Sequence, residues 1–336
     1  MKIAVRCPNW IGDAVMAFPA IRALRSFCPE TEIIVTGRDF LAELFRGQDE
    51  INGIMTLPEK FSLRAFLRGA AKLRDAGFDQ GLLFTNSFSS ALLFRAAGIK
   101  KLTGYARDGR SFMLSRRMKK APNIGHHSNY YLRLVEFFAD QQSSLELKSS
   151  LQLSQAEIEA GRVLLKKESI KEGSQLVSVS PAAAYGPAKA WPADRFQQVS
   201  QMLISDNSDL HVLLLGSARE RELCRRISAP LGKRAHNMAG VLSLRETMIM
   251  ISLSRLLLGN DSGLMHLAAA LGTPACAVFG PTVPAATAPL GDGHVILQHS
   301  VDCWPCKHRS CPLDHACMTS VSVAEVLSAL KGILSR

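Results

Sequence analysis

The chain has 336 residues and a mass of 36.6 kDa, which is long for one ordinary α/β domain and sufficient for two. Hydrophobic residues make up 47% and charged residues 21%, a composition that excludes a disordered or fibrous protein. Lys and Arg number 40 against 29 Asp and Glu, and the formal net charge of +11 predicts an anionic partner. The charge is uneven, because residues 1–150 carry 22 basic and 14 acidic side chains (+8) whereas residues 151–336 carry 18 and 15 (+3).

The sequence favours a cytoplasmic protein without a membrane-spanning segment. Arg6 and Asp13 interrupt the N-terminal apolar run before it reaches the length of a signal peptide. The longest apolar stretch, 264–279, is too short to cross a bilayer. Eight cysteines in a chain of this length do not make a disulfide scaffold, so we expect the reducing cytosol.

In the first half, short β-branched runs alternate with amphipathic segments, which is typical of repeated β-α units around a parallel sheet. The predicted strands are 2–7, 32–36, 51–57, 79–85 and 101–105. The predicted helices are 14–27, 38–46, 60–75 and 87–97.

A polar stretch at 140–155 predicts a linker, after which the alternation starts again. The predicted strands of the second half are 175–180, 210–216, 255–260 and 274–280. The predicted helices are 155–168, 192–206, 218–229, 243–253, 263–271 and 322–334. Two doubly wound domains bind ligands at the carboxyl ends of their strands, so we expect the functional residues directly after strands, at a cleft between the domains.

Asp13 follows the first strand in the segment 9–13 (NWIGD). An aspartate at the start of a helix commonly caps the helix, and this is the simpler interpretation. The alternative is a carboxylate that accepts a proton from a substrate hydroxyl, kept ionised by the helix N-terminus.

Lys189 lies in a loop of small residues, 180–192, that follows a predicted strand and precedes a helix opened by Pro192. A lysine in a loop is usually solvated. Here, between small residues and Trp191, it is an unpaired cation placed to bind phosphate.

Asp261, Ser262 and Gly263 connect an apolar strand directly to a helix that contains His266. The free amides of this turn, at the positive end of a helix dipole, predict an anion site. Asp261 either binds a ribose hydroxyl or caps the helix. His266 lies one turn further on, so it and Ser262 could face the same ligand. The pattern is typical of a nucleotide-diphosphate site.

The chain lacks both a G-x-G-x-x-G fingerprint and a P-loop motif, which argues against a nicotinamide dehydrogenase and a P-loop NTPase. Gly216 ends another strand, and Glu220 behind it either caps a helix or contacts an adenosine.

Basic residues gather in two segments of the first half. The segment 100–120 carries eight of them against Asp108 alone. The other set is spaced by four along a predicted helix: Lys60, Arg64, Arg68 and Lys72. Both could be solvated surfaces, but this density of like charge indicates an anionic partner. Aromatic residues are 7% and no nucleic-acid-binding module is present, so a phosphorylated lipid at a membrane surface fits better than nucleic acid.

The C-terminal part holds a C-x2-C-x4-C-x5-C run formed by Cys303, Cys306, Cys311 and Cys317. Four such thiols could bind zinc, but the spacing matches no standard zinc finger, and the thiols could also be oxidised or packed. We therefore assign no metal site from the sequence.

Taken together, the motifs resemble those of the ADP-heptose:lipopolysaccharide heptosyltransferases, particularly the type II branch, over nearly the whole chain. The matching pieces are 9–13 (NWIGD), 83–88 (LFTNSF), 103–110 (TGYARDGR), the pairs 126–127 (HH) and 130–131 (YY), 187–191 (PAKAW), 260–266 (NDSGLMH) and 279–282 (FGPT).

The resemblance implies a GT-B fold, with two Rossmann-like domains facing a central cleft. It implies an acceptor-binding domain at 1–155, a donor-binding domain at 156–321 and a helix at 322–336 that packs back toward the first domain. The implied reaction is inverting transfer of L-glycero-D-manno-heptose from ADP-heptose onto heptosyl-Kdo2-lipid A of the lipopolysaccharide core. ADP-heptose is a co-substrate, and neither a cofactor nor a metal is expected. We expect a monomer at the cytoplasmic face of the inner membrane of a Gram-negative cell, with a phosphorylated Kdo/lipid A acceptor and no nucleic-acid partner.

The resemblance also assigns residues. Asp13 is expected as the general base, with Lys189 as the second catalytic residue. The implied donor-binding residues are Tyr185, Lys189, Gly216, Glu220, Leu242, Asp261, Ser262, Gly263 and His266. The acceptor-binding residues expected in the first domain are Asn9, Lys60, Arg64, Arg68, Asn86, Ser87, Arg107, Arg110 and His127.

Two alternatives remain. Heptosyltransferase I differs by its acceptor, Kdo2-lipid A, but the loop at Tyr185 departs from the Thr-rich version of that branch. A non-catalytic anion-binding or nucleic-acid-binding protein that uses residues 100–120 is the alternative from a different class.

Overall fold

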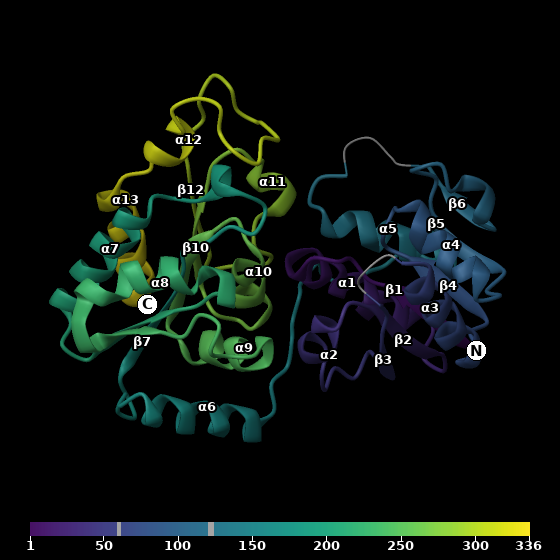
Figure 1. The fold of residues 1–336 in the computed structure, drawn as a ribbon, viewed down its shortest axis with the longest axis horizontal. Helices are drawn as coiled ribbons and strands as arrows, with labels where there is room; N and C mark the ends of the chain where they lie inside the picture. The colour runs from purple at the N-terminus through teal and green to yellow at the C-terminus, as the bar shows by residue number, and fades with distance from the viewer. Residues whose placement is uncertain (59–61, 120–123) are drawn as a thin grey trace. The chain divides into compact units, whose positions relative to one another are not determined.

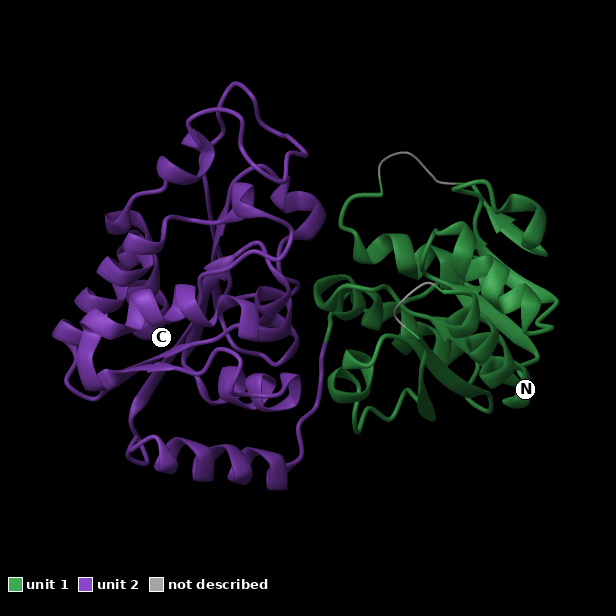
Figure 2. Ribbon diagram, in the orientation of Figure 1, with its two compact units in different colours: residues 1–149 green, residues 150–336 purple. Residues whose placement is uncertain are grey.

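A computed structural model describes residues 1–58, 62–119 and 124–336, and it divides into two compact units, residues 1–149 and 150–336 (Figures 1 and 2). The division falls inside the predicted polar linker, six residues before the expected boundary at 155. Local contacts explain the difference. Ser149 Oγ donates to Val15 O in unit 1 at 2.8 Å, whereas Leu151 N donates to Ala270 O in unit 2 at 2.7 Å.

The described residues of unit 1 form a six-stranded parallel sheet with the order β3-β2-β1-β4-β5-β6 (Figure 1). Its strands are β1 (Lys2–Arg6), β2 (Glu32–Gly37), β3 (Gly53–Thr56), β4 (Gln80–Leu83), β5 (Lys101–Tyr105) and β6 (Arg116–Met118). Ile3 is in register with Ile33 on one side and Gln80 on the other, so β1 lies inside the sheet. The middle residues of β1 are fully buried, as expected of a strand covered on both faces.

Helices cover this sheet. They are α1 (Ile11–Phe27), α2 (Phe40–Leu44), α3 (Leu63–Asp75), α4 (Phe88–Ala96) and α5 (Ser128–Ala139), with a short 3-10 turn at Ser111–Met113. Ser62 and Ser87 cap α3 and α4 by accepting the N–H of Ala65 and Ser90. α1 packs against α5, far away in the sequence.

The described residues of unit 2 form a second six-stranded parallel sheet, with the order β12-β11-β10-β7-β8-β9. Its strands are β7 (Gln175–Ser180), β8 (Leu210–Leu214), β9 (Ala235–Asn237), β10 (Leu256–Asn260), β11 (Ala275–Phe279) and β12 (Val295–Gln298). Its helices are α6 (Gln155–Lys167), α7 (Ala193–Asp206), α8 (Arg221–Ser228), α9 (Leu244–Leu253), α10 (Gly263–Ala270), α11 (Pro284–Thr287), α12 (Ala316–Thr319) and α13 (Val323–Leu334), with 3-10 segments at Pro187–Lys189, Ala218–Glu220 and Ala229–Arg234.

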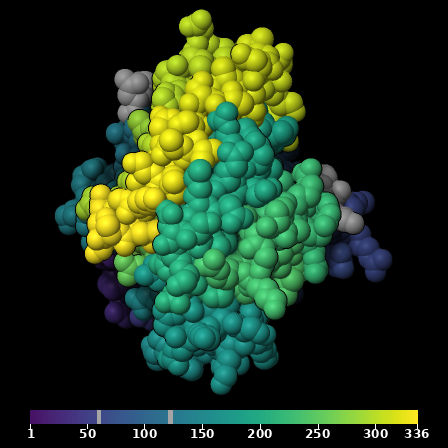
Figure 3. Space-filling view, turned by 90° about the vertical axis from the view of Figure 1, so that its left-hand side faces the viewer, coloured from purple at the N-terminus to yellow at the C-terminus, as the bar shows by residue number. Residues whose placement is uncertain are grey.

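The last helix, α13, is an integral part of unit 2. Its buried residues Val326, Leu330 and Ile333 join the core formed by the sheet and α7, and α13 lies along α7 on the surface shown in Figure 3. We expected residues 322–336 to form a helix that packs back toward the first domain. The described contacts of this helix bury its apolar face in unit 2.

Both sheets are doubly wound, and each has one point where the strand order reverses. In unit 1 this point lies between β1 and β4, and in unit 2 it lies between β7 and β10. A crevice forms at the carboxyl ends of the strands at such a point, because the connections on its two sides run to opposite faces of the sheet. The topology therefore places the segments that follow β1, β4, β7 and β10 where ligands bind. No helix within the described residues has the length and apolar character needed to span a membrane.

An ion pair ties α6 to α9 within unit 2. Glu157 Oε1 accepts a hydrogen bond from Arg245 Nε at 2.7 Å, and Glu157 Oε2 accepts one from Arg245 Nη2 at 2.9 Å. Arg245 is buried and also donates to Gln152 O at 3.1 Å. The hydrogen bonds from Arg245, together with those from Ser154, lower the pKa of Glu157 to about 2.

Replacing Glu157 with Gln should lower the free energy of unfolding of unit 2 by about 2 kcal/mol at neutral pH, because the buried guanidinium of Arg245 loses its charged partner. The folded-state pKa of Glu157 lies below the ordinary 4.5, so the pair stabilises above that pH and the stabilisation is lost as the pH falls toward about 2. Urea unfolding at a series of pH values should therefore show the two proteins converging in acid. Glu159→Gln, on the same helix in an exposed pair with Arg162, is the control, and an equal loss in that variant would contradict the prediction.

Candidate functional site

The loop that follows β7 is anchored to the end of β10 by Trp191 and Asn260. Asn260 Oδ1 accepts the N–H of Trp191 at 3.0 Å, and Asn260 Nδ2 donates to Pro181 O at 2.8 Å. The Trp191 indole is buried, donates to Val321 O at 2.9 Å and packs edge-on against Phe196. These contacts fix both ends of the loop. They therefore also fix the position of the Lys189 backbone, which lies between them at the switch point of unit 2.

Lys189 and Asp261 form a largely buried ion pair. Lys189 Nζ lies 2.5 Å from Asp261 Oδ2, and the two side chains are 13% and 6% exposed. Thr282 Oγ1, which follows β11, donates to the same Asp261 oxygen at 2.7 Å. Our interpretation of Lys189 as an unpaired cation was therefore wrong: the sequence separation of 72 residues hid its partner, which the adjacent strands β7 and β10 bring beside it.

The turn after Asp261 opens helix α10, with Ser262 at the N-cap position and Gly263 as the first helical residue. The Ser262 side chain caps no backbone N–H, and its Oγ is buried without a hydrogen-bond partner among the described residues. The N-terminal amides of α10 are thus left beside the Lys189–Asp261 pair. His266 is 5% exposed, so little of its ring is available to a ligand on the accessible side of this helix.

Tyr185 lies against the same lysine and is hydrogen-bonded to residues 303–317, which we call the Cys-rich segment. Its hydroxyl donates to Lys307 O at 2.8 Å. The charged ends of Lys189 and Arg309 lie 5.2 Å and 5.3 Å from the centre of the Tyr185 ring, within the range of cation–π attraction. The Cys-rich segment therefore adds a second cation, Arg309, to the surroundings of the Tyr185 ring.

The Cys-rich segment also contacts the backbone of Ala188, the residue before Lys189. Ala188 N donates to Arg309 O at 3.0 Å, and the carbonyl oxygen of the same residue lies 2.8 Å from His315 Nε2. A Cβ on Gly186 would lie 2.3 Å from Arg309 O, so only glycine allows this close approach. Sequence analysis assigned no role to Arg309 and His315, and Thr282 appeared only as the end of the matching piece 279–282. The contacts of all three are with residues distant in the chain.

The thiols of this segment are all free. Burial raises the pKa of Cys317, which keeps its thiol protonated at neutral pH. Within the described residues, no group of three or more His, Cys, Asp or Glu side chains is arranged to hold a metal ion.

Gly216 and Glu220 lie after β8. Glu220 Oε2 accepts the N–H of Ser217 at 2.6 Å in a capping box, which confirms the capping interpretation of Glu220. A Cβ on Gly216 would lie 2.9 Å from that carboxylate oxygen. Gly240 N donates to Gly216 O at 3.0 Å, so the loops after β8 and β9 are joined, and half-buried Leu242 follows directly.

In unit 1, Asp13 is the third residue of α1 and is half-buried. The N-cap position belongs to Trp10, so Asp13 is not the N-cap that the simpler interpretation required. The negative charge of Asp13 reaches Tyr131 on α5: burial raises the pKa of Tyr131 well above its usual value, and Asp13 raises it further. Tyr131 is thus a neutral hydrogen-bond donor, and its hydroxyl lies 3.2 Å from His127 Nε2.

Asn86 is fixed by two neighbours from distant segments. Its Oδ1 accepts from Tyr130 OH at 2.9 Å and from Arg110 Nη2 at 3.3 Å. Arg110 is 0% exposed and also donates to the carbonyl oxygens of Tyr105 and Thr85. Our prediction that Arg110 contacts the acceptor was therefore wrong. Its guanidinium is enclosed by unit 1 and positions Asn86.

The remaining expected acceptor residues differ in accessibility. Arg64 and Arg68 are exposed on α3, one turn apart, and Arg107 is exposed after β5. His127 precedes α5 and stacks on Tyr130, with ring centres 5.6 Å apart. Lys60 lies outside the described residues. Asn9 and Ser87 both line a pocket within unit 1.

The Lys189–Asp261 pair should show thermodynamic coupling, because removing one charge leaves the other buried and unpaired. We expect a double-mutant cycle of Lys189→Met and Asp261→Asn to give a coupling free energy of about 1–3 kcal/mol in urea unfolding of unit 2. The exposed pair Lys331–Asp206 of the same unit is the matched control, for which we expect less than about 1 kcal/mol. Equal coupling free energies in the two cycles would contradict the prediction that the Lys189–Asp261 pair is the stronger one.

Comparison with known proteins identifies the family and the fold of the chain. Residues 66–317 match the sequence profile of glycosyltransferase family 9 (heptosyltransferase). Lipopolysaccharide heptosyltransferase 2 of Salmonella typhimurium is 29% identical over 300 residues, which cover 86% of each chain. Lipooligosaccharide heptosyltransferase 2 of Haemophilus ducreyi is 28% identical over 318 residues, covering 89% of this chain and 88% of that one.

Among solved structures, ADP-heptose LPS heptosyltransferase II of E. coli superposes with a TM-score of 0.86 at 26% identity, covering 100% of this chain and 99% of that chain. The two Rossmann-like units are thus those of a GT-B fold, as predicted, and the chain belongs to glycosyltransferase family 9.

Proposed function

We propose that this glycosyltransferase moves L-glycero-D-manno-heptose from ADP-heptose onto heptosyl-Kdo2-lipid A, with inversion at the anomeric carbon. The observation that carries the proposal is the buried Lys189–Asp261 pair at the start of α10, found in a chain of glycosyltransferase family 9. A cation and free amides at one strand end are what a sugar-diphosphate donor needs.

The donor half of the reaction belongs to unit 2. As the bond between the anomeric carbon and the diphosphate breaks, negative charge grows on the leaving phosphate. Lys189 and the N-terminal amides of α10 supply fixed positive charge for it, and Asp261 with Thr282 holds the lysine in one position. Tyr185 and Arg309 extend this surface, and the joined loops at Gly216 and Leu242 accept the adenosine.

The acceptor half belongs to unit 1. Asp13 accepts the proton of the acceptor hydroxyl as that oxygen forms its bond to the anomeric carbon on the side opposite the departing ADP. The reaction thus forms one C–O bond and breaks one, with the proton moving to Asp13. The charge of Asp13 acts on Tyr131, whose hydroxyl contacts His127, and Asn86 is held by Arg110 and Tyr130 for a hydrogen bond to the sugar.

The lipid character of the acceptor is matched by α3. Leu63 and Leu67 are 75% and 57% exposed, next to the exposed Arg64 and Arg68. An accessible helix face that combines apolar and cationic side chains is suited to a surface of anionic lipid. We therefore place the protein at the cytoplasmic face of the membrane as a peripheral monomer, and the +8 charge of residues 1–150 favours a phosphorylated acceptor.

The type II acceptor is favoured because the relatives that match over 86% and 89% of this chain carry the name heptosyltransferase 2. Incubation with ADP-heptose and either Kdo2-lipid A or heptosyl-Kdo2-lipid A, read by mass, tests this. We expect one added heptose on the second acceptor only, also in the presence of EDTA, because Lys189 and helix amides take the place of a metal clamp. Transfer to Kdo2-lipid A alone would assign type I instead, and transfer to neither would refute the proposal.

Asp13→Asn should reduce kcat at least about 1,000-fold while the Kd for ADP-heptose stays within about twofold, because the amide cannot accept the hydroxyl proton and the donor binds to unit 2. Single-turnover kinetics and calorimetric titration with ADP-heptose measure the two quantities. Lys189→Ala is the matched comparison. It should raise the Kd for ADP-heptose as well as lower kcat. Near-normal turnover of Asp13→Asn would remove this residue from the mechanism.

A further inference from the structure

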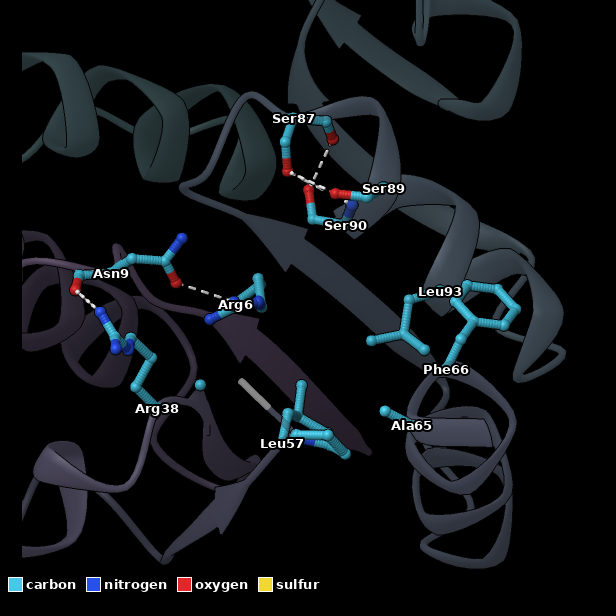
Figure 4. A pocket seen from close by; sticks show the side chains of 12 residues that line it. Arg6, Asn9, Arg38, Leu57, Ala65, Phe66, Ser87, Ser89, Ser90 and Leu93 are labelled. Carbon is cyan, nitrogen blue, oxygen red and sulfur yellow. Dashed lines mark hydrogen bonds between the residues drawn. The ribbon is translucent and has the colours of Figure 1, made fainter. Parts of the chain in front are cut away.

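Unit 1 contains a pocket of about 390 Å³ at the carboxyl ends of its strands (Figure 4). Its walls come from the segments after four neighbouring strands: Asn9 after β1, Arg38 after β2, Leu57 after β3 and Ser87 after β4. The pocket therefore lies at the β1/β4 switch point, the position in unit 1 that corresponds to the Lys189 site of unit 2.

Arg6, at the end of β1, supplies positive charge to this pocket. Its Nη1 donates to Cys7 O at 2.9 Å and to Thr36 O at 3.3 Å, and its Nη2 donates to Asn9 Oδ1 at 2.9 Å. These acceptors are neutral, so they orient the guanidinium without cancelling its charge. Burial raises the pKa of the Cys7 thiol to about 12, so that neighbour is also uncharged at neutral pH. The Nε of Arg6 is buried and has no hydrogen-bond partner among the described residues.

A second guanidinium, that of Arg38, lies on the same wall. Figure 4 shows Arg6 and Arg38 on either side of Asn9, whose Oδ1 accepts from Arg6 and whose backbone oxygen accepts from Arg38 Nη1 at 3.4 Å. Burial lowers the pKa of Arg6, and the charge of Arg38 lowers it further, as expected for two cations held close together. None of the described residues that line the pocket is acidic.

The other walls are polar at one end and apolar at the other. Ser87, Ser89 and Ser90 form the start of α4, and Figure 4 shows them above the arginines. The Oγ atoms of Ser87 and Ser89 are 3.3 Å apart. Leu57, Phe66 and Leu93 form the apolar side. Hydroxyl groups and the positive end of a nine-residue helix thus complement the arginines, and the apolar side suits the carbon skeleton of a sugar.

We propose that this pocket binds an anionic substituent of the acceptor, a phosphate or a sugar carboxylate, through Arg6 and Arg38. The inference rests on the proposed function, since it assigns the site to the acceptor. Asn9, which lines the pocket, and Asp13, the proposed base, belong to the same short segment, 9–13. An anion bound in the pocket would therefore hold the acceptor close to the base. Guanidinium groups bind such oxygen anions in bidentate geometry, which fixes orientation as well as position.

Arg6→Gln should raise the acceptor KM at least about tenfold, with the KM for ADP-heptose unchanged, because one charge-assisted interaction is lost from acceptor binding only. Arg38→Gln should act in the same direction, and Arg6→Lys, which keeps the charge, should lie between Arg6→Gln and the unaltered enzyme. Arg46→Gln, an exposed arginine of unit 1 outside the pocket, is the control and should leave both KM values unchanged.

Two altered acceptors identify the anion. One acceptor is dephosphorylated, and the other has its carboxylates esterified. The rise in acceptor KM caused by Arg6→Gln should disappear with the acceptor that lacks the group bound in the pocket. Persistence of the full effect with both would overturn the proposal, as would an unchanged acceptor KM in both Arg6→Gln and Arg38→Gln. Thermal unfolding checks each variant, and if Arg6→Gln does not fold, Arg38→Gln and Ser89→Ala decide.

Inorganic phosphate provides a readout that does not depend on turnover. Titration of the full chain, followed by NMR, should show a phosphate-binding event that Arg6→Gln abolishes and that Arg46→Gln and Lys189→Ala retain. If the enzyme transfers no heptose but this event is present, the proposed function fails and the anion pocket stands. If transfer occurs but phosphate binding is the same in Arg6→Gln as in the unaltered chain, the pocket proposal fails and the function stands.

Discussion

The ion pair between Lys189 and Asp261 is the interaction on which the proposed donor site depends. Two charges removed from water are stable only when each has its partner and its hydrogen bonds, and here Thr282 completes the set. Because these residues follow β7, β10 and β11, the pair joins the ends of strands that lie side by side in the sheet. A cation held in this way keeps one position, which electrostatic catalysis requires.

Both units place positively charged groups at the point where the strand order of the sheet reverses. Each sheet reverses its strand order next to its first strand, and each reversal is lined by positive charge: Lys189 with the start of α10 in unit 2, and Arg6 with the start of α4 in unit 1. The two sites differ in how their charge is balanced. Lys189 is paired with a carboxylate, whereas the hydrogen bonds of Arg6 go to neutral oxygens. Such a difference suits the roles proposed for the two sites, a donor site that fixes a leaving group and an acceptor site that attracts an anion.

Hydrophobic patterning predicted the inner strands of both sheets and most helices to within a few residues, because strands buried on both faces are continuous apolar runs. It did not predict β6, β9 and β12, which lie at sheet edges. β6 reads Arg-Arg-Met and β9 reads Ala-His-Asn, and neither segment has a strand pattern of its own. These segments become strands because β5 and β8 offer them hydrogen bonds. Helix α5 was also missed, although its tyrosines were noticed, since its apolar face is explained only by the α1 surface that it covers.

The sequence by itself determined which chemical groups follow the strands, since short loops after buried strands can be located from the pattern alone. Asp13, Lys189 and the turn at Asp261 were found in this way. Tertiary structure decided what each group faces. Arg110 and Arg6 are both arginines near strand ends, yet one is enclosed by carbonyl groups and supports Asn86, and the other lines a pocket. The reason is that the charge of a side chain is a local property, whereas its burial and its partners depend on segments that only the folded chain brings together.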